Sequence, residues 1–273
     1  MLNEKQIETM IKAGRDFMKM PHEDPDYKSD QDLKKQQPPL VKEAMGGQLI
    51  DLPTDFSDLN LENDFMKIIN TRQSHRVFTS QNMTLLELSF LLWSTQGVKS
   101  IRGKSYATIR TVPCGGARHE FETYFVAQYV EGLEKGLYHY LPMTHQIEFL
   151  SPVEDCREFI DKSTAGQTWC TKASIVLYYS SVFYRAEWRY GVYSHRVQLM
   201  DIGHVMQNVY MACTAAHLGT TAIGYIDGDY LNAAFTLDGE EECMICCCPV
   251  GTVNAKNQQA EIDFYAFVKE QGL

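Results

Sequence analysis

Apolar residues near the N-terminus recur at helical spacing in two places, and a polar segment separates them. Residues 1–20 predict a short amphipathic helix, and residues 65–69 predict a second one. Residues 21–53 are rich in Pro, Asp, Lys and Gln, which is typical of an extended arm. Such an arm can lie over a partner subunit or remain a disordered tail. We therefore expect an N-terminal helix and arm over residues 1–62 and a folded domain over residues 63–273.

Two longer helices are predicted in the folded domain. The first follows Thr84, which forms a capping-box pattern with Glu87 ahead of a leucine stripe, and Gly97 is expected to end it. The second is expected to begin with Asp201 as its N-cap and to end at Gly219. Its predicted buried face consists of Ile202, Val205, Met206, Val209, Tyr210 and Cys213.

Short apolar or alternating runs predict six strands. Two of them flank Pro142 and predict a hairpin. The set covers residues 123–130, 136–141, 146–150, 174–183, 221–226 and 243–251. Strands and helices do not alternate regularly along the chain, so we predict an α+β fold rather than a doubly wound sheet. The sequence also lacks the motifs of a Rossmann dinucleotide site, a P-loop and a hydrolase nucleophile elbow.

Composition and charge narrow the class of protein. Hydrophobic residues make up 44% of the 273 residues, which is enough for a sizeable core. The formal net charge of −10 argues against nucleic-acid binding and against attraction to anionic membranes. No stretch approaches the roughly 18–20 apolar residues of a membrane span, and residues 1–10 lack a signal-peptide core. We therefore expect a cytoplasmic protein whose cysteines are reduced.

Four of the eight cysteines gather in one run near the C-terminus. Cys243 and Cys246 form a C-x-x-C pattern that Cys247 and Cys248 follow, so a metal or redox site is one hypothesis. No second C-x-x-C pair and no pair of histidines completes a tetrahedral ligand set nearby. The interleaved apolar residues instead indicate a buried strand, and we predict no metal site.

Arg72, Ser74 and Arg76 form the strongest candidate binding segment. Residues at even spacing lie on one side of an extended chain, and Arg72 and Arg76 would also share a face of a helix. Two guanidinium groups and a hydroxyl can receive a phosphate or a carboxylate through paired hydrogen bonds. A solvated surface is the simpler alternative. The turn at residues 113–116 is a second candidate, because a flat ligand can lie against its glycine-rich backbone.

An ordered series of short motifs runs through the folded domain. It consists of residues 72–76, 92–97, 110–118, 132–140, 201–208, 218–224 and 249–251. No single motif is specific, but their order resembles the FMN-dependent nitroreductase family, and within it the branch of SagB-type dehydrogenases. The resemblance covers residues 63–267, and the N-terminal arm carries little of it.

The resemblance implies a fold and an assembly. The fold is α+β, with a central, mostly antiparallel sheet flanked by helices, and two chains intertwine as a homodimer with two FMN sites at the interface. The same resemblance implies which residues bind the phosphate and the ribityl chain of FMN. They are Arg72, Gln73, Ser74 and Arg76.

The flavin ring is assigned to other segments by the same resemblance. The turn of Pro113, Cys114, Gly115 and Gly116 matches one that packs against the isoalloxazine from the other subunit. Gly224 and Tyr225 match the place where a backbone N–H faces the flavin N5, and Gly251 completes the cofactor-binding set.

Two departures from the family pattern concern FMN. Cys114 stands where relatives usually have Ser, so a hydroxyl contact is replaced while a backbone contact survives. Many relatives also place Arg or Lys just after the strand that ends near Gly251, whereas the nearest cation here is Lys256. A buried phosphate needs compensating charge, so we expect looser FMN binding than in the family at large.

The chemistry implied by the resemblance is ping-pong turnover, in which NAD(P)H reduces the flavin and an electron-poor acceptor such as a nitroaromatic or a quinone reoxidises it. The flavin carries the reaction, so no catalytic side chain is nominated. Arg118 and His119 follow the turn and are candidates for substrate contact or simply solvated residues. His204 is expected to be a core histidine. Alternative functions are a SagB-type azoline dehydrogenase acting on peptide heterocycles and a non-catalytic flavin-binding homologue.

Overall fold

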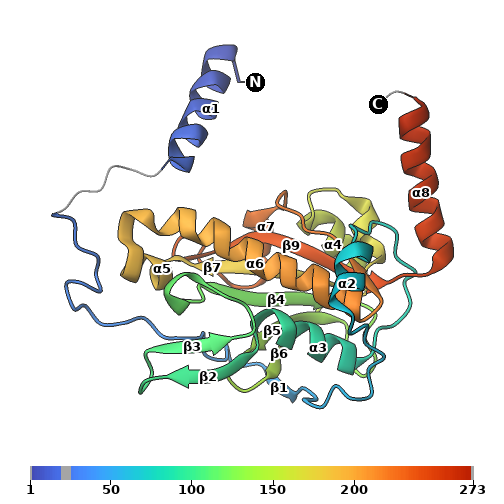
Figure 1. The fold of residues 1–273 in the computed structure, drawn as a ribbon, viewed down its shortest axis with the longest axis horizontal. Coiled ribbons are helices and arrows are strands. Elements are labelled where there is room, and N and C mark those ends of the chain that lie inside the picture. The colour runs from blue at the N-terminus through green and yellow to red at the C-terminus, as the bar shows by residue number, and fades with distance from the viewer. Residues whose placement is uncertain (1, 20–25, 272–273) are drawn as a thin grey trace.

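A seven-stranded antiparallel sheet forms the centre of the molecule (Figure 1). The computed structural model describes residues 2–19 and 26–271. The strand order is β1-β6-β5-β4-β7-β9-β8, and every neighbouring pair is antiparallel. The strands are β1 (Gln48–Asp51), β4 (Phe121–Ala127), β5 (Gly136–Leu141), β6 (Gln146–Pro152), β7 (Ile175–Val182), β8 (Leu218–Thr220) and β9 (Glu242–Thr252). The predicted α+β fold with helices around an antiparallel sheet is confirmed.

Helices cover both faces of this sheet. Side chains of α3 and α6 form one hydrophobic cluster with the sheet, and side chains of α4 and α7 form a second. No helix in the described part of the chain is long and apolar enough to cross a membrane. The helices are α1 (Glu4–Met18), α2 (Phe65–Thr71), α3 (Leu85–Gln96), α4 (Cys156–Ser163), α5 (Phe183–Tyr190), α6 (Ser194–Ala215), α7 (Gly228–Ala234) and α8 (Ala255–Glu270).

Strand β7 shows why the core has two sides. Ile175, Leu177 and Tyr179 belong to the cluster with α3 and α6, whereas Val176 and Tyr178 belong to the cluster with α4 and α7. All five side chains are fully buried, because successive residues of a strand point to opposite faces and both faces are covered. The sequence of a strand buried on both sides is a nearly continuous apolar run. This pattern is why residues 174–183 could be predicted as a strand.

Helix α3 confirms the predicted start at Thr84. The Thr84 hydroxyl accepts from the Glu87 N–H, and the Glu87 carboxylate accepts from the Thr84 N–H. The helix ends at Gly97 as predicted, but the φ of Gly97 is −56°, so no left-handed cap is involved. A side chain at Gly97 would instead place its Cβ 2.3 Å from Cε3 of Trp93. The glycine is therefore required by packing against the Trp93 ring.

The predicted boundaries of α6 were wrong. The helix begins at Ser194, and Asp201 lies inside it because its carboxylate accepts the N–H of Gly115 from another segment rather than capping its own helix. The helix ends at Ala215, since the chain reverses at His217 (φ 58°) and Gly219 already belongs to β8. Of the predicted buried face, Met206 and Tyr210 are only partly buried.

Other elements departed from the sequence pattern. The strand expected over residues 221–226 is reduced to one bridge between Ile223 and Cys247, and β8 precedes it. The hairpin of β2 (Val98–Arg102) and β3 (Ala107–Arg110) was not predicted, because most of β2 is exposed and carries no apolar alternation. Helices α4, α5 and α8 were also missed. Residues 243–251 were correctly predicted as a buried strand, β9, with Cys246, Cys247 and Cys248 in the core.

The described part of the predicted arm packs on its own chain. Strand β1 pairs with β6 at the edge of the sheet. Further back, the Lys42 N–H donates to the buried Glu122 carboxylate at 3.0 Å, and the Trp188 indole donates to the Lys35 carbonyl at 3.1 Å. Residues 26–53 of the arm are therefore not a free tail, and they pack on their own chain rather than only on a partner subunit. The domain boundary at residue 62 stays a prediction.

Candidate functional site

The segment with Arg72, Ser74 and Arg76 is extended and follows directly on α2. Arg72 is the C-cap residue of that helix. Its guanidinium lies over the Tyr210 ring, with Cζ 5.2 Å from the centroid, and the Ser74 hydroxyl lies 3.0 Å from the Tyr210 hydroxyl. His75 points to the other side and is buried. The even spacing therefore places Arg72 and Ser74 on one side of the chain, as predicted for an extended segment.

Arg76 differs from its two partners. Its side chain is exposed, and its backbone N–H donates to the Glu261 carboxylate of α8 at 2.6 Å. The same carboxylate lies 3.4 Å from Nδ1 of His75. The segment is therefore held between α6 on one side and α8 on the other.

Tyr210 joins this segment to the chain that follows β8. Its hydroxyl accepts the Ala222 N–H at 2.9 Å and lies 3.2 Å from the Thr221 hydroxyl. The His75 N–H donates to the Thr220 carbonyl at 2.8 Å. Sequence reasoning placed Tyr210 on the buried face of its helix and missed this role. Its signal would have been a polar hydroxyl at an apolar position of the helical stripe.

Gly224 and Tyr225 continue from this junction and are exposed, Tyr225 to 75%. Within the described residues, their backbone N–H groups donate to no acceptor. A Cβ built on Gly224 would meet no atom within 4 Å. These two amides follow Ala222, whose N–H donates to the same Tyr210 hydroxyl that lies beside Ser74. We call Arg72, Ser74, Gly224 and Tyr225 together the oxyanion receptor.

Two glycines on paired strands bring the sheet close to the receptor. Gly219 of β8 lies opposite Gly251 of β9. A Cβ on Gly219 would lie 2.9 Å from the Cβ of His75, and one on Gly251 would lie 3.0 Å from Phe78. Neither position has room for a larger residue, because Gly219 packs against His75 and Gly251 packs against Phe78, which follows the segment.

A cavity of about 490 Å³ adjoins the other side of the segment, where Gln73 and His75 point. Its walls come from α2, the end of α6 and the start of α8. The lining residues are Glu62, Lys67, Thr71, Gln73, His75, Thr214, His217, Leu218, Val253, Asn254, Ala255 and Gln258. The structure thus separates Gln73 from Arg72 and Ser74, although all three were predicted to bind one cofactor.

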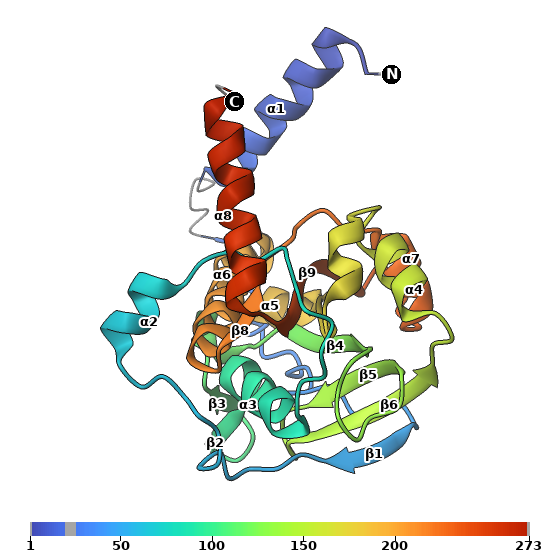
Figure 2. The ribbon, with the colours of Figure 1, turned by 90° about the vertical axis from the view of Figure 1, so that its right-hand side faces the viewer.

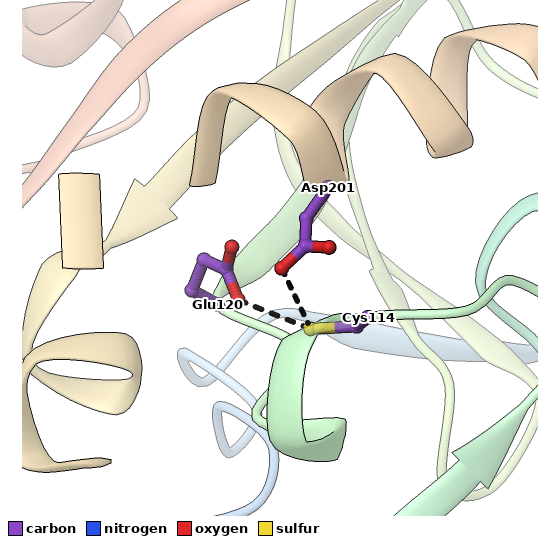
Figure 3. Close-up of side chains that lie close together, drawn as sticks. All are labelled: Cys114, Glu120 and Asp201. Carbon is purple, nitrogen blue, oxygen red and sulfur yellow. Dashed lines mark hydrogen bonds between the residues drawn. The ribbon is translucent and has the colours of Figure 1, made fainter. Parts of the chain in front are cut away.

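The turn at residues 113–116 packs against the first half of α6. The Gly115 N–H donates to both Asp201 oxygens, at 3.0 and 2.9 Å. Figure 3 shows Cys114, Glu120 and Asp201 pointing toward one another. The Cys114 sulfur lies 3.3 Å from a carboxylate oxygen of each acid and accepts the His119 N–H at 3.0 Å. This network fixes the turn on α6.

Burial and like charge govern the protonation of this cluster. Burial, with a contribution from Asp201, raises the pKa of Glu120 to about 7. Burial and the two neighbouring carboxylates raise the pKa of the Cys114 thiol, so it stays protonated and can donate to them. The three ligand atoms lie within 4.8 Å of one another, close enough for one metal ion to bridge. The hydrogen bonds already made by sulfur and Asp201 give the cluster a structural role without one.

The turn at residues 113–116 and the oxyanion receptor contact α6 at different positions along its length. Asp201 and Tyr210 are nine residues apart, which corresponds to about 13 Å along a helix. The turn contacts Asp201, whereas Arg72 and Ser74 contact Tyr210, so the two groups touch α6 at separate positions.

Comparison with known proteins decides the family. The profile of the nitroreductase family matches residues 69–252. The chain belongs to the nitroreductase family. A protein of Methanocaldococcus jannaschii that carries the name nitroreductase is 35% identical over 175 residues, which are 64% of this chain and 83% of the relative. The trifolitoxin-processing protein TfxB of Rhizobium leguminosarum bv. trifolii is 25% identical over 165 residues, 58% of this chain and 44% of TfxB.

Solved structures share the nitroreductase fold. A Ralstonia eutropha protein described as a nitroreductase superposes with a TM-score of 0.62 at 23% identity, covering 81% of this chain and 97% of that one. A chain of the Escherichia coli microcin synthetase McbBCD complex, with truncated pro-MccB17 bound, superposes with a TM-score of 0.56 at 17% identity, covering 92% and 95% of the two chains. These similarities concern the fold.

The nitroreductase-family fold buries both residues predicted to contact substrate. Arg118 is 4% exposed and stacks on the rings of Tyr106 and Trp188, and it donates to the Gly116 carbonyl. Burial lowers the pKa of His119 to about 2, so its ring stays neutral. Neither residue is solvated, and a substrate role for them stays a prediction. His204, expected in the core, is exposed instead because it lies on the outer face of α6.

Proposed function

We propose that this nitroreductase-family protein is an FMN-dependent oxidoreductase that uses NAD(P)H to reduce electron-poor acceptors such as nitroaromatics and quinones. The observation that supports it most is the oxyanion receptor, in which Arg72 and Ser74 contact Tyr210 and the amides of Gly224 and Tyr225 donate to no acceptor among the described residues. All eight cysteines are free, which fits the reducing cytoplasm where we place the protein.

The residues present fit a flavin phosphate and ring. Arg72 offers a fixed guanidinium and Ser74 a hydroxyl, both of which suit phosphate oxygens. The exposed N–H groups of Gly224 and Tyr225 would face the ring edge, where a donor stabilises added electron density. When bound, FMN supplies hydride transfer, and the protein's own part is to bind, orient and shield. No side chain is needed as a general acid or base for that transfer.

The proposed active unit is a homodimer. Within one chain the turn at residues 113–116 and the receptor are about 13 Å apart along α6. The outer surface of α6 and the loop before it carry exposed apolar side chains, including Val192, Leu199 and Met200. Pairing two copies through this face would cover these side chains and bring the turn of one copy to the receptor of the other.

Steady-state kinetics with menadione as acceptor test this proposal. Initial rates are measured at several NADH or NADPH concentrations and several acceptor concentrations, with the protein loaded with FMN. We expect parallel double-reciprocal lines, because nicotinamide leaves before the acceptor binds. Intersecting lines, or no NAD(P)H oxidation by the loaded protein, would contradict the proposal.

A second candidate is a SagB-type azoline dehydrogenase, which oxidises heterocycles in modified peptides. The sequence match to TfxB favours it, because that protein is named for processing trifolitoxin, and the shared fold with a chain of a microcin synthetase complex is compatible with it. Incubation of the FMN-loaded protein with a thiazoline-containing peptide would distinguish the two. Loss of two hydrogen atoms from the peptide in mass spectra, without NAD(P)H, would support the dehydrogenase. FMN binding with neither reaction would indicate a non-catalytic homologue.

A further inference from the structure

The hairpin of β2 and β3 lies in a stretch without acidic residues. In a chain of net charge −10, residues 88–119 contain no Asp or Glu. Arg110 and Arg118 in this stretch are buried and hydrogen-bonded within the fold. The remaining cations, Lys99, Arg102 and Lys104, are exposed on the hairpin, and none forms an ion pair with any described residue.

The two strands of this hairpin have different surroundings. In β3, Ala107, Thr108 and Arg110 are buried against the body of the protein. In β2, every residue after Val98 is exposed, and no other described strand pairs with its outer edge. Figure 1 shows the hairpin projecting from the body next to the arm. The outer edge of β2 is therefore an open row of backbone donors and acceptors.

Side chains on both sides of β2 favour a negatively charged partner. Neighbouring residues of a strand point to opposite faces, so Ile101 and Arg102 lie on different sides. Ile101 is 48% exposed and adds an apolar contact between the charges. The cations that repel the β2 edge of a second copy would attract a strand bearing carboxylates. An isolated two-stranded sheet is also marginally stable, and a third strand would strengthen it.

We infer that the outer edge of β2 binds an extended, acidic peptide segment of a partner molecule as a third strand. Main-chain hydrogen bonds to β2 hold the segment, and Lys99, Arg102 and Lys104 select for acidic side chains. The inference does not depend on flavin or on the proposed reaction, since none of these residues belongs to the receptor or to the turn.

Fluorescence anisotropy with a defined peptide tests this inference. The probe is a fluorescein-labelled peptide of alternating Glu and Val, and a peptide of alternating Lys and Val serves as the charge control. A third peptide has the Glu–Val sequence with alternate backbone nitrogens methylated, which blocks strand pairing without changing charge. We expect only the first peptide to bind, and binding to weaken as salt rises.

The matched variants carry three charge reversals each. Lys99→Glu, Arg102→Glu and Lys104→Glu together should weaken binding by about ten-fold or more, because three attractive contacts become repulsive. Lys5→Glu, Lys12→Glu and Arg15→Glu on α1 make the same change in net charge and should leave binding unchanged. Circular dichroism and FMN binding report whether each variant is folded.

Three results would overturn the inference. Equal binding to the hairpin variant and the wild type would place the peptide elsewhere. Equal binding of the methylated peptide would exclude strand addition. Tighter binding of an oligothymidylate than of the acidic peptide would identify a nucleic-acid surface instead.

Discussion

At the scale of single residues, Tyr210 holds the candidate site together. The Arg72 guanidinium lies over its ring. Its hydroxyl accepts the Ala222 N–H and is within hydrogen-bond distance of the Ser74 and Thr221 hydroxyls. One side chain therefore joins the predicted phosphate segment to the strand end that leads to Gly224. Sequence patterns made Arg72 and Ser74 candidates because charge and spacing are visible in a sequence. They missed the role of Tyr210, because a helix position does not reveal which loop will reach it.

Removing one cation should weaken FMN binding. Arg72→Ala is expected to raise the dissociation constant about ten- to hundred-fold, since a charge-assisted contact to phosphate is lost. Quenching of flavin fluorescence measures the affinity. Arg15→Ala on the exposed face of α1 is the matched control and should change nothing. Unchanged affinity in Arg72→Ala would mean that the receptor is assigned wrongly.

The Glu120 carboxyl should make stability depend on pH. Its folded pKa of about 7 lies above the ordinary value of 4.5, so the folded state holds the proton more tightly. This contribution is complete below pH 4.5 and is lost as pH rises through about 7, for a total of about 3 kcal/mol.

Glu120→Gln removes this dependence because glutamine keeps a neutral side chain at every pH. Urea unfolding of both proteins between pH 4.5 and 8 measures it. The wild type should lose about 3 kcal/mol relative to the variant over that range. A constant difference between the two proteins would show that Glu120 titrates normally.

At the scale of elements, the sequence predicted those that are specified by local patterns and missed those that depend on tertiary contacts. The start of α3 and the strand β7 were predictable, because a capping box and a doubly buried apolar run are encoded locally. The start of α6 was not, because Asp201 uses its carboxylate for the Gly115 N–H of a distant turn. Strand β2 was not predicted either, because an exposed strand has no apolar pattern in the sequence.

Gly97 at the end of α3 tests whether a glycine is needed there because of side-chain packing or because of its backbone conformation. Gly97→Ala should destabilise the fold by about 1–3 kcal/mol, because the new Cβ would lie 2.3 Å from the Trp93 ring. Gly228→Ala is the control, since its Cβ would lie 3.8 Å from the Met244 carbonyl oxygen, an ordinary contact. Urea unfolding compares the two. Equal stability of Gly97→Ala and wild type would contradict the steric account.

At the scale of the whole molecule, the halves of the predicted site come from separate parts of one chain. Helices α1 and α8 both project from the same side of the body (Figures 1 and 2). Both carry exposed apolar side chains, for example Met10 on α1 and Phe267 on α8. These features fit the proposed intertwined dimer. A single sequence can supply the motifs of both halves, but their separation along α6 emerges only from the structure.

Disrupting the outer face of α6 should separate the copies and remove flavin together. Leu199→Lys combined with Met200→Lys places two charges on side chains that are 49% and 53% exposed in the monomer. We expect a monomer in analytical ultracentrifugation and FMN affinity reduced about ten-fold or more, since the partner's turn is lost. Leu33→Lys on the arm, 54% exposed, is the control. A wild-type monomer that binds FMN fully would contradict the shared site.

The most direct test of the central claim is a visible absorption spectrum of the purified protein with added FMN, followed by anaerobic addition of NADH and then NADPH. The account predicts a protein-bound flavin spectrum that bleaches with at least one nucleotide. Absence of bound flavin after FMN is added would contradict the assignment of the receptor. A bound flavin that neither nucleotide bleaches would contradict the proposed NAD(P)H oxidoreductase.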